Sequence, residues 1–258
     1  MAFVPSILIV NDDGITAPGI ANLIEAVHDL GKITVVAPDS PQSGMGHAVT
    51  IGNTLRLEKV DIFKEYDIEA YQCSGTPVDC VKIAQDVVLE HKPDICLSGI
   101  NHGSNASINV IYSGTMSAAM EAAINDIPAA GFSLMDFKWE ADFSLAKKVA
   151  RAITQNMLRQ RLPENFLLNV NIPRVIKEEF KGIKIARQAM AQWQERFEKR
   201  KDPHGKDYYW MAGKFVNFDK GGDTDLELLK QGYASVVPVK FDLTDKEMGN
   251  WLKGNWDL

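Results

Sequence analysis

The stretch Ile7-Leu8-Ile9-Val10-Asn11-Asp12-Asp13-Gly14 joins a short apolar run to a polar turn that ends in glycine. The apolar run is rich in branched side chains and bounded by polar residues, which is typical of a buried parallel strand. Pro18 suits the first turn of a helix, and apolar residues then recur at helical spacing until Gly31. Residues 33–37 form the next apolar run. The sequence therefore predicts a strand–helix–strand unit that opens the chain.

The same alternation continues along the chain. The alanine-rich stretch 115–125 is one of the expected helices, and its small side chains would let it lie close to a sheet. Strands that alternate with helices predict an α/β fold with a doubly wound, mostly parallel sheet. Besides those already named, helices are expected over 77–91 and 143–157, and strands over 95–97, 128–134 and 166–172.

The composition changes near residue 174. Residues 188–207 are charged and polar, and aromatic stretches at 208–210 and 214–218 flank Gly213, which suggests a hairpin or arm. A helix over 225–230, a strand over 233–239 and a short last helix capped by Thr244 are expected to follow. We therefore expect a catalytic core at 1–173 and a C-terminal extension at 174–258 that carries an arm used in assembly.

The overall composition is that of an ordinary globular protein. The chain has 258 residues, of which 45% are hydrophobic and 24% are charged, so it can bury a sizeable core. Its net charge of −6 gives no general attraction for a DNA or RNA duplex. A small anionic substrate must therefore be met locally, by a metal ion or by backbone N–H groups.

The cysteines and the first residues bear on the compartment. Cys73, Cys80 and Cys96 are an odd number and form no CxxC motif, which favours a reducing environment over a disulfide framework. Residues 1–6 contain neither a basic segment nor a long apolar stretch, so we expect no leader peptide and no membrane span. The expected location is the cytoplasm.

Three polar, glycine-bearing loops follow the predicted strands, at 11–14, 38–44 and 98–105. In open parallel sheets, ligands bind outside the carboxyl ends of the strands, so these loops should lie along one edge. The first loop has neither the GxGxxG fingerprint of dinucleotide-binding proteins nor the GxxxxGK[ST] motif of P-loop ATPases. Both classes are therefore disfavoured.

The adjacent carboxylates of Asp12 and Asp13 are the most informative pair in the sequence. At a strand end they repel each other and lose hydration, and a divalent cation with a preference for oxygen ligands would compensate them. Ser43 would add a hydroxyl ligand and Asn101 a neutral amide oxygen. The alternative is a plain turn, because Asn-Asp-Asp-Gly is also good turn chemistry.

Several residues would suit a phosphate group. Gly14 permits close backbone approach, and Ser113-Gly114-Thr115 leads into the alanine-rich helix, where a helix start offers N–H groups to an anion. The alternative for that tripeptide is an ordinary helix cap. His47 would contact phosphate, carry a proton or serve only a structural role. Gly44 and Asn105 complete the set of expected phosphate or substrate contacts.

Five motifs in the first half of the chain form a recognisable set. They occur in this order: Asn11-Asp12-Asp13-Gly14-Ile15; Ala37-Pro38-Asp39 with Ser43 and Gly46-His47; Gly75-Thr76-Pro77 with Asp79-Cys80; Ser98-Gly99-Ile100-Asn101 with Gly103 and Asn105; and Ser113-Gly114-Thr115. Together they resemble the survival protein SurE family of stationary-phase nucleotidases. The resemblance is strong over residues 7–135 and thinner beyond.

The resemblance implies a Rossmann-like core and one divalent metal ion per subunit, Mg²⁺ or Mn²⁺, held by Asp12, Asp13, Ser43 and Asn101. It implies release of phosphate from nucleoside 5′-monophosphates, sometimes from 3′-monophosphates, and in some members from short polyphosphate. It also implies homodimers or homotetramers that exchange C-terminal arms. His102 stands where relatives often carry a different residue, so no essential role is expected for it.

The expected reaction is phosphomonoester hydrolysis, in which water attacks phosphorus while the cation polarises the phosphate. Asp12 or Asp13 would orient or deprotonate that water, and the sequence does not choose between them. Asn101 completes the expected catalytic residues. A broader phosphatase or exopolyphosphatase is the alternative enzyme, and a non-catalytic nucleotide sensor is the alternative from another class. Donors to the phosphate oxygens would come from Gly14, Ser113, Gly114 and Thr115.

Overall fold

A nine-stranded sheet forms the centre of the computed structural model, which describes residues 4–175 and 177–257. Residues 1–3, on which the expectation of no leader peptide partly rests, lie outside the described residues. The strands lie in the order β3 (Leu57–Val60), β4 (Glu69–Cys73), β2 (Lys32–Pro38), β1 (Ser6–Val10), β5 (Ile95–His102), β6 (Ala129–Leu134), β7 (Leu167–Ile172), β11 (Tyr233–Pro238) and β8 (Gly182–Ile185).

The middle of this sheet is parallel. Strands β4, β2, β1, β5, β6 and β7 run in one direction, and Ile7 of β1 pairs with Ile33 on one side and Ile95 on the other. In this sheet β3 pairs antiparallel with β4 and β11 pairs antiparallel with β7, whereas β8 pairs parallel with β11. The predicted α/β fold with a mostly parallel sheet is confirmed.

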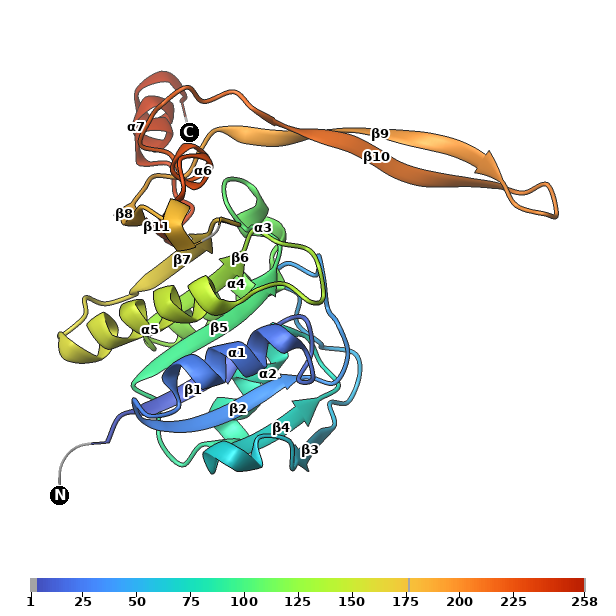
Figure 1. Ribbon diagram of the computed structural model, residues 1–258. Coiled ribbons are helices and arrows are strands. Elements are labelled where there is room, and N and C mark those ends of the chain that lie inside the picture. Colours follow the sequence, from blue (N-terminus) through green and yellow to red (C-terminus); the bar gives the residue numbers. More distant parts are fainter. Residues whose placement is uncertain (1–3, 176, 258) are drawn as a thin grey trace.

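Helices cover both faces of the sheet (Figure 1). On one side α1 (Pro18–Val27) packs against α5 (Ser144–Arg159), and on the other α2 (Pro77–Ile83) packs against α4 (Gly114–Ile124). Successive side chains of β1 pack on opposite faces of the sheet. Ile7 and Ile9 belong to the apolar cluster on one face, and Leu8 and Val10 belong to the cluster on the other. Burial on both faces explains why this strand reads as a continuous apolar run.

Strand β5 is longer than the sequence pattern indicated. It continues from Ile95 to His102, with a register shift against β6 between Ser98 and Asn101. The residues that we expected in a loop after Leu97 therefore belong largely to the strand. The reason is that a polar end of a buried strand has no apolar periodicity to mark it.

The predicted hairpin arm is present, but its turn lies elsewhere. Strands β9 (Ala191–Lys201) and β10 (Asp207–Asn217) pair over their full lengths and stand away from the sheet (Figure 1). Gly213 lies inside β10, opposite Glu195, and the chain reverses between residues 201 and 207. The expectation that Gly213 marks the turn was wrong, because a charged strand outside the core does not show the apolar alternation of a buried one.

The remaining elements are short. The helices α3 (Asn109–Tyr112), α6 (Asp225–Lys230) and α7 (Lys246–Asn255) lie outside the two main layers. Asp245, not Thr244, caps α7, since its side chain accepts a hydrogen bond from the Met248 N–H. Helix α2 ends earlier than expected and continues as a π-helical turn at Ala84–Val88. Within the described chain, no helix is long and apolar enough to span a bilayer.

The segment after residue 174 contributes two strands, β8 and β11, to the same sheet as the preceding part. It also contains the arm, α6 and α7. The division of the chain at residue 173 stays a prediction.

Candidate functional site

A cavity of about 770 Å³ lies where the carboxyl ends of β1 and β5 meet the base of the arm. Its volume falls in the range of small-molecule sites. Asp12, Ser43 and Asn101 line it, whereas Asp13, the fourth predicted ligand, is not among the described lining residues. The full lining is Asp12, Ser43, Gly44, Asn101, His102, Gly103, Ser104, Asn105, Asn109, Tyr112, Ser113, Phe137, Trp193, Glu195, Met211, Ala212 and Gly213.

The carboxylates of Asp12 and Asp13 are held by different partners. Asp12 is buried, with 4% of its surface exposed, and its Oδ1 accepts a hydrogen bond from the Thr115 hydroxyl. Asp13 is half-buried, and its Oδ2 accepts from the backbone N–H of His102 at 3.2 Å. Asn11 closes the turn by donating from Nδ2 to the carbonyl of Gly14 at 2.7 Å. These hydrogen bonds therefore hold the turn and both carboxylates in place at the end of β1.

This environment disfavours the charged forms of the two acids. Burial, with the neighbouring charge of Asp13, raises the pKa of Asp12 to about 7, although hydrogen bonds from Thr115 act in the opposite direction. Burial also raises the pKa of Asp13, against the hydrogen bond from His102. Among the described residues, no ion pair involves either acid. Apart from the ring of His102, which favours the charged form of Asp13, no described lysine, arginine or histidine pairs with either acid.

The loop after β2 is attached to both sides of the site. The Gln42 N–H donates to the carbonyl of Asp12 at 2.7 Å, which places Ser43 and Gly44 at the cavity wall. The Gly46 N–H donates to the carbonyl of Tyr112 at 3.1 Å, which ties the loop to α3. The loop thus joins the first strand end to the helix that follows β5.

His47 is placed away from the cavity lining and contacts Glu121 of α4. Its Nε2 lies 2.9 Å from the Glu121 carboxylate, which also accepts from Lys82 at 2.6 Å. Burial would raise the pKa of Glu121, but hydrogen bonds from His47, Lys82 and Asn125 outweigh it and lower the pKa to about 2. In this arrangement His47 joins the loop to α4, and its expected phosphate contact stays a prediction.

Asn101 and Asn105 have different surroundings. Asn101 donates from Nδ2 to the carbonyl of Gly103 at 2.8 Å, so its amide oxygen is the atom suited to a ligand. Asn105 donates from Nδ2 to Ser133 at 2.8 Å and from its backbone N–H to Asn171 at 2.8 Å. It therefore belongs to a buried polar network at the ends of β6 and β7 as well as to the cavity wall.

This network was missed by sequence reasoning. Asn169 and Asn171 are both buried in β7, and Asn169 donates to the Asn105 carbonyl at 2.9 Å. Two asparagines at alternate positions of an apolar strand were the available signal, because buried amides need partners. They fix the loop that follows β5.

The start of α4 contacts Asp12 directly. Ser113 caps the helix by accepting from the Met116 N–H at 3.0 Å and also lines the cavity, so the cap and a cavity role coexist. A Cβ on Gly114 would lie 2.7 Å from the Cβ of Asp12, closer than such atoms approach in proteins. Glycine at this position therefore lets the helix start approach the acid. The Thr115 hydroxyl is engaged with Asp12, and its expected phosphate contact stays a prediction.

The donor set fits a hard divalent cation. The four predicted ligands offer only oxygen atoms, two of them from carboxylates. Over the ranges 4–175 and 177–257, no group of three or more His, Cys, Asp and Glu side chains is arranged to hold a metal. A site of this kind suits an ion that keeps water or substrate oxygens among its ligands, such as Mg²⁺ or Mn²⁺.

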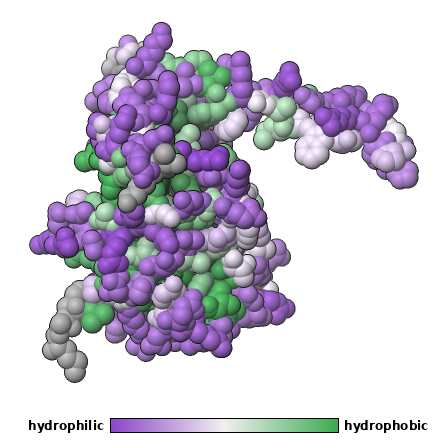
Figure 2. Space-filling model, in the orientation of Figure 1, coloured by the Kyte–Doolittle hydropathy of each residue, from purple (hydrophilic) through white to green (hydrophobic). Residues whose placement is uncertain are grey.

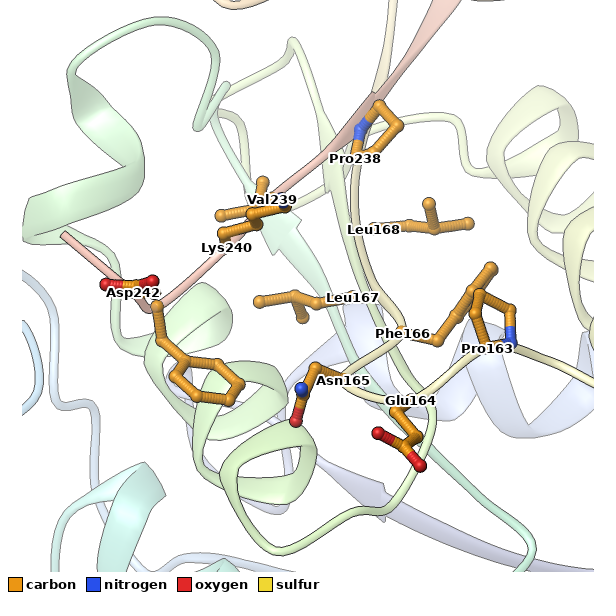
Figure 3. A pocket seen from close by; sticks show the side chains of 11 residues that line it. Pro163, Glu164, Asn165, Phe166, Leu167, Leu168, Pro238, Val239, Lys240 and Asp242 are labelled. Atoms are coloured by element: carbon orange, nitrogen blue, oxygen red, sulfur yellow. The ribbon is translucent and has the colours of Figure 1, made fainter. Parts of the chain in front are cut away.

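A second cavity, of about 760 Å³, lies at the opposite end of β7 (Figure 3). Figure 3 shows apolar side chains such as Leu167, Leu168 and Val239 around it, with the carboxylates of Glu164 and Asp242 nearby. It contains none of the predicted site residues among its described lining. The cavity at the carboxyl ends of the strands is therefore the candidate site.

Comparisons with known proteins bear on the family and the fold. The sequence model of the family described as Survival protein SurE matches residues 7–195. The chain is 59% identical over 251 residues to a protein of Christiangramia forsetii named 5′-nucleotidase SurE, covering 96% of each chain. It is 57% identical over 254 residues to the protein of that name from Flavobacterium psychrophilum, covering 98% of each.

A solved structure shares the fold along nearly the full chain. The crystal structure of the SurE protein from Aquifex aeolicus superposes with a TM-score of 0.83 at 41% sequence identity. The match covers 97% of this chain and 99% of that one. Because the family model matches residues 7–195 and the relatives match nearly the full chain, the chain belongs to the survival protein SurE family.

Proposed function

We propose that this chain is a metal-dependent 5′-nucleotidase that hydrolyses nucleoside 5′-monophosphates to nucleoside and phosphate. The observation that carries the proposal is the pair of adjacent acids at the carboxyl end of β1, buried Asp12 and half-buried Asp13, with Asp12, Ser43 and Asn101 lining one cavity. Two relatives that share 59% and 57% of its residues carry this activity in their names.

The composition of the cavity supports a need for a cation. Its described lining contains Asp12 and Glu195 but neither lysine nor arginine. A phosphate monoester brings about two further negative charges, which such a wall would repel. A divalent ion on Asp12, Asp13, Ser43 and Asn101 would reverse the local charge and let the phosphate bind.

When bound, the ion would supply Lewis acidity toward the phosphate and lower the pKa of a coordinated water. The protein's own groups then have separate tasks. Thr115 holds Asp12 in one orientation, and the His102 N–H does the same for Asp13. The start of α4, at Ser113 and Gly114, presents the positive end of a helix toward phosphate oxygens. Asp12 or Asp13 accepts the proton of the attacking water.

A phosphate-release panel tests the activity. The purified protein is incubated with AMP, GMP, the matching 3′-monophosphates and polyphosphate, each with Mg²⁺, with Mn²⁺ and with EDTA. We expect release from 5′-monophosphates that requires a divalent ion. Release from polyphosphate alone would favour an exopolyphosphatase, nucleotide binding without release would favour a sensor, and neither result would support the proposal.

We further propose that the arm joins copies of the chain into a homodimer or homotetramer. The arm carries exposed aromatic side chains far from the sheet, and Figure 2 shows pale patches among its hydrophilic residues. Phe197, Tyr209 and Trp210 are 67%, 58% and 58% exposed, which is more aromatic surface than an isolated hairpin normally shows to water. Light scattering after chromatography of the intact chain and of a chain with residues 197–211 replaced by a short turn would decide this.

The cysteines support a reducing compartment such as the cytoplasm. All three are buried free thiols, and none of them pairs in a disulfide.

A further inference from the structure

The base of the arm forms one wall of the catalytic cavity. Trp193, Glu195, Met211 and Gly213 all line it. The register of the hairpin places these residues on one face, because Glu195 lies opposite Gly213 and residues two apart along a strand share a face. One face of the arm is therefore part of the cavity wall.

Trp193 is the largest side chain of this wall and is held in place. Its indole Nε1 donates to Oδ1 of Asn109 at 2.8 Å. Its ring packs against Phe215, with centroids 5.2 Å apart and planes inclined by 56°. The side chain nevertheless remains 45% exposed. An aromatic ring whose polar atom is satisfied and whose surface stays open is suited to binding a flat apolar partner.

The arm base is also fixed to the loop that follows β5. Asp225 of α6 accepts from the Ser107 N–H at 2.7 Å and from the Ala189 N–H at 3.0 Å. The Ser107 hydroxyl donates to the carbonyl of Ala189 at 2.8 Å. These bonds lie within two residues of both the cavity loop and the start of β9. They place Trp193 relative to the site before any ligand arrives.

A second aromatic ring comes from α3. Asn109 and Tyr112 are three positions apart, so they lie on one side of this helical turn, and both line the cavity. Tyr112 is 54% exposed. The wall of the cavity thus combines the oxygen-bearing side chains of Asp12, Ser43 and Asn101 with the aromatic rings of Trp193 and Tyr112.

We propose that Trp193 is the platform on which the base of the nucleotide stacks. This inference rests on the proposed function, since it requires a nucleotide whose phosphate lies at Asp12. A phosphate site and an aromatic surface in one cavity match the two parts of a nucleoside monophosphate, its phosphate and its base. Stacking uses the flat surface that every base has, so the platform accepts purines and pyrimidines alike.

The test compares a nucleotide with the same molecule lacking its base. Steady-state kcat/KM is measured for AMP and for ribose 5-phosphate with wild type, Trp193→Ala, Trp193→Phe and Trp251→Ala. We expect Trp193→Ala to lower the ratio of the two values by about 5- to 150-fold, mainly through KM for AMP. Trp193→Phe keeps a ring and should retain most of the ratio.

Trp251→Ala is the control. Trp251 is a tryptophan of α7 that is 55% exposed, and it lies outside both the arm and the described cavity lining. Its removal should leave the ratio unchanged, and light scattering of each variant checks that assembly is the same. An unchanged ratio in Trp193→Ala, or wild type that prefers AMP no more than ribose 5-phosphate, would overturn the platform. Wild type that releases phosphate from neither compound would instead refute the proposed function.

Discussion

The hydroxyl of Thr115 donates a hydrogen bond to Oδ1 of Asp12, although the two residues lie 103 positions apart in the chain. Thr115 is fully buried in the first turn of α4, and Asp12 lies two positions after the last residue of β1. The bond fixes the orientation of a carboxylate whose pKa is raised by burial. The first turn of α4 therefore orients the Asp12 carboxylate by direct contact.

Thr115→Val removes this bond while keeping the shape of the side chain. We expect a 10- to 100-fold loss of Mn²⁺ affinity or of kcat/KM, roughly the effect of losing an outer partner of a metal ligand. Isothermal titration with Mn²⁺ and phosphate-release kinetics measure the two quantities. Thr154→Val is the control, because Thr154 is a fully buried helical threonine that bonds only to the Ala150 carbonyl at 2.8 Å. Equal activity in the two variants would argue against a role for Thr115.

Asp13→Asn tests the acidic pair. The amide removes one of the two negative charges that would hold the cation, so we expect kcat/KM to fall by more than about 100-fold, beyond the effect of an outer partner. Wild type should gain stability with Mn²⁺, by about 2.7 kcal/mol at one hundred times the dissociation constant. The variant should show little such gain in thermal unfolding.

Asp61→Asn is the control for that substitution. Asp61 lies on the surface, where it pairs with Lys64 at 2.5 Å and is 76% exposed. The activity of the Asp61→Asn variant and its stabilisation by Mn²⁺ should equal those of wild type. Full activity in Asp13→Asn would remove Asp13 from the site.

Gly114→Ala tests the close approach of α4 to the acid. The added methyl group would lie 2.7 Å from Cβ of Asp12, so either the helix or the carboxylate must move. We expect a loss of about 1–3 kcal/mol in the free energy of unfolding, typical of overpacking, together with reduced activity. Denaturant titration and kinetics measure these effects.

Gly249→Ala offers a comparison of the same substitution in a helix. A Cβ at Gly249 of α7 would have no neighbour within 4 Å. Here alanine should stabilise the protein by about 0.5–1 kcal/mol, because it restricts the unfolded chain. If Gly114→Ala behaved in the same way, the close packing against Asp12 would have no energetic consequence.

Glu121→Gln tests the ion-pair cluster of α2, α4 and the His47 loop. Glu121 has a folded-state pKa of about 2 against an ordinary value of 4.5, and its side chain is 5% exposed. A lowered folded pKa stabilises the protein above the unfolded pKa, and this contribution disappears as the pH falls through the folded pKa. The shift corresponds to about 3 kcal/mol.

The free energy of unfolding of wild type should therefore exceed that of Glu121→Gln at pH 5–7, and the difference should shrink between about pH 4.5 and pH 2. Urea titrations at several pH values give both curves. A difference that stays constant over this range would show that the charge of Glu121 contributes nothing to stability.

The periodicity of the sequence was sufficient for the central elements of the fold. Strands β1, β2, β6 and β7 and helices α1, α4 and α5 lie close to their predicted ranges because each buries a continuous apolar face. Strands β3, β4 and β8 were missed, since most of their residues are exposed or half-buried and leave no such pattern. The arm was predicted without its turn for the same reason.

The residues of the candidate site likewise fall into those that the sequence predicted and those that only the structure revealed. Asp12 and Asp13 were found because adjacent carboxylates after a buried strand are informative without any knowledge of their neighbours. Trp193 was not, because nothing in a polar, charged segment indicates that it reaches Asn109, which lies 84 positions away. The same holds for the bond between His47 and Glu121, 74 positions apart.

The sequence by itself determined the α/β class, the strand end that carries the two acids and the family. Those properties depend on local periodicity, on the order of residues along one element and on the spacing of short motifs. Only the tertiary structure decided that Thr115 bonds to Asp12, that Asn105 joins a buried amide network and that the arm closes one wall of the cavity. Hydrophobic patterning specifies which face of an element is buried, but the partner of a buried polar group depends on the positions of distant loops.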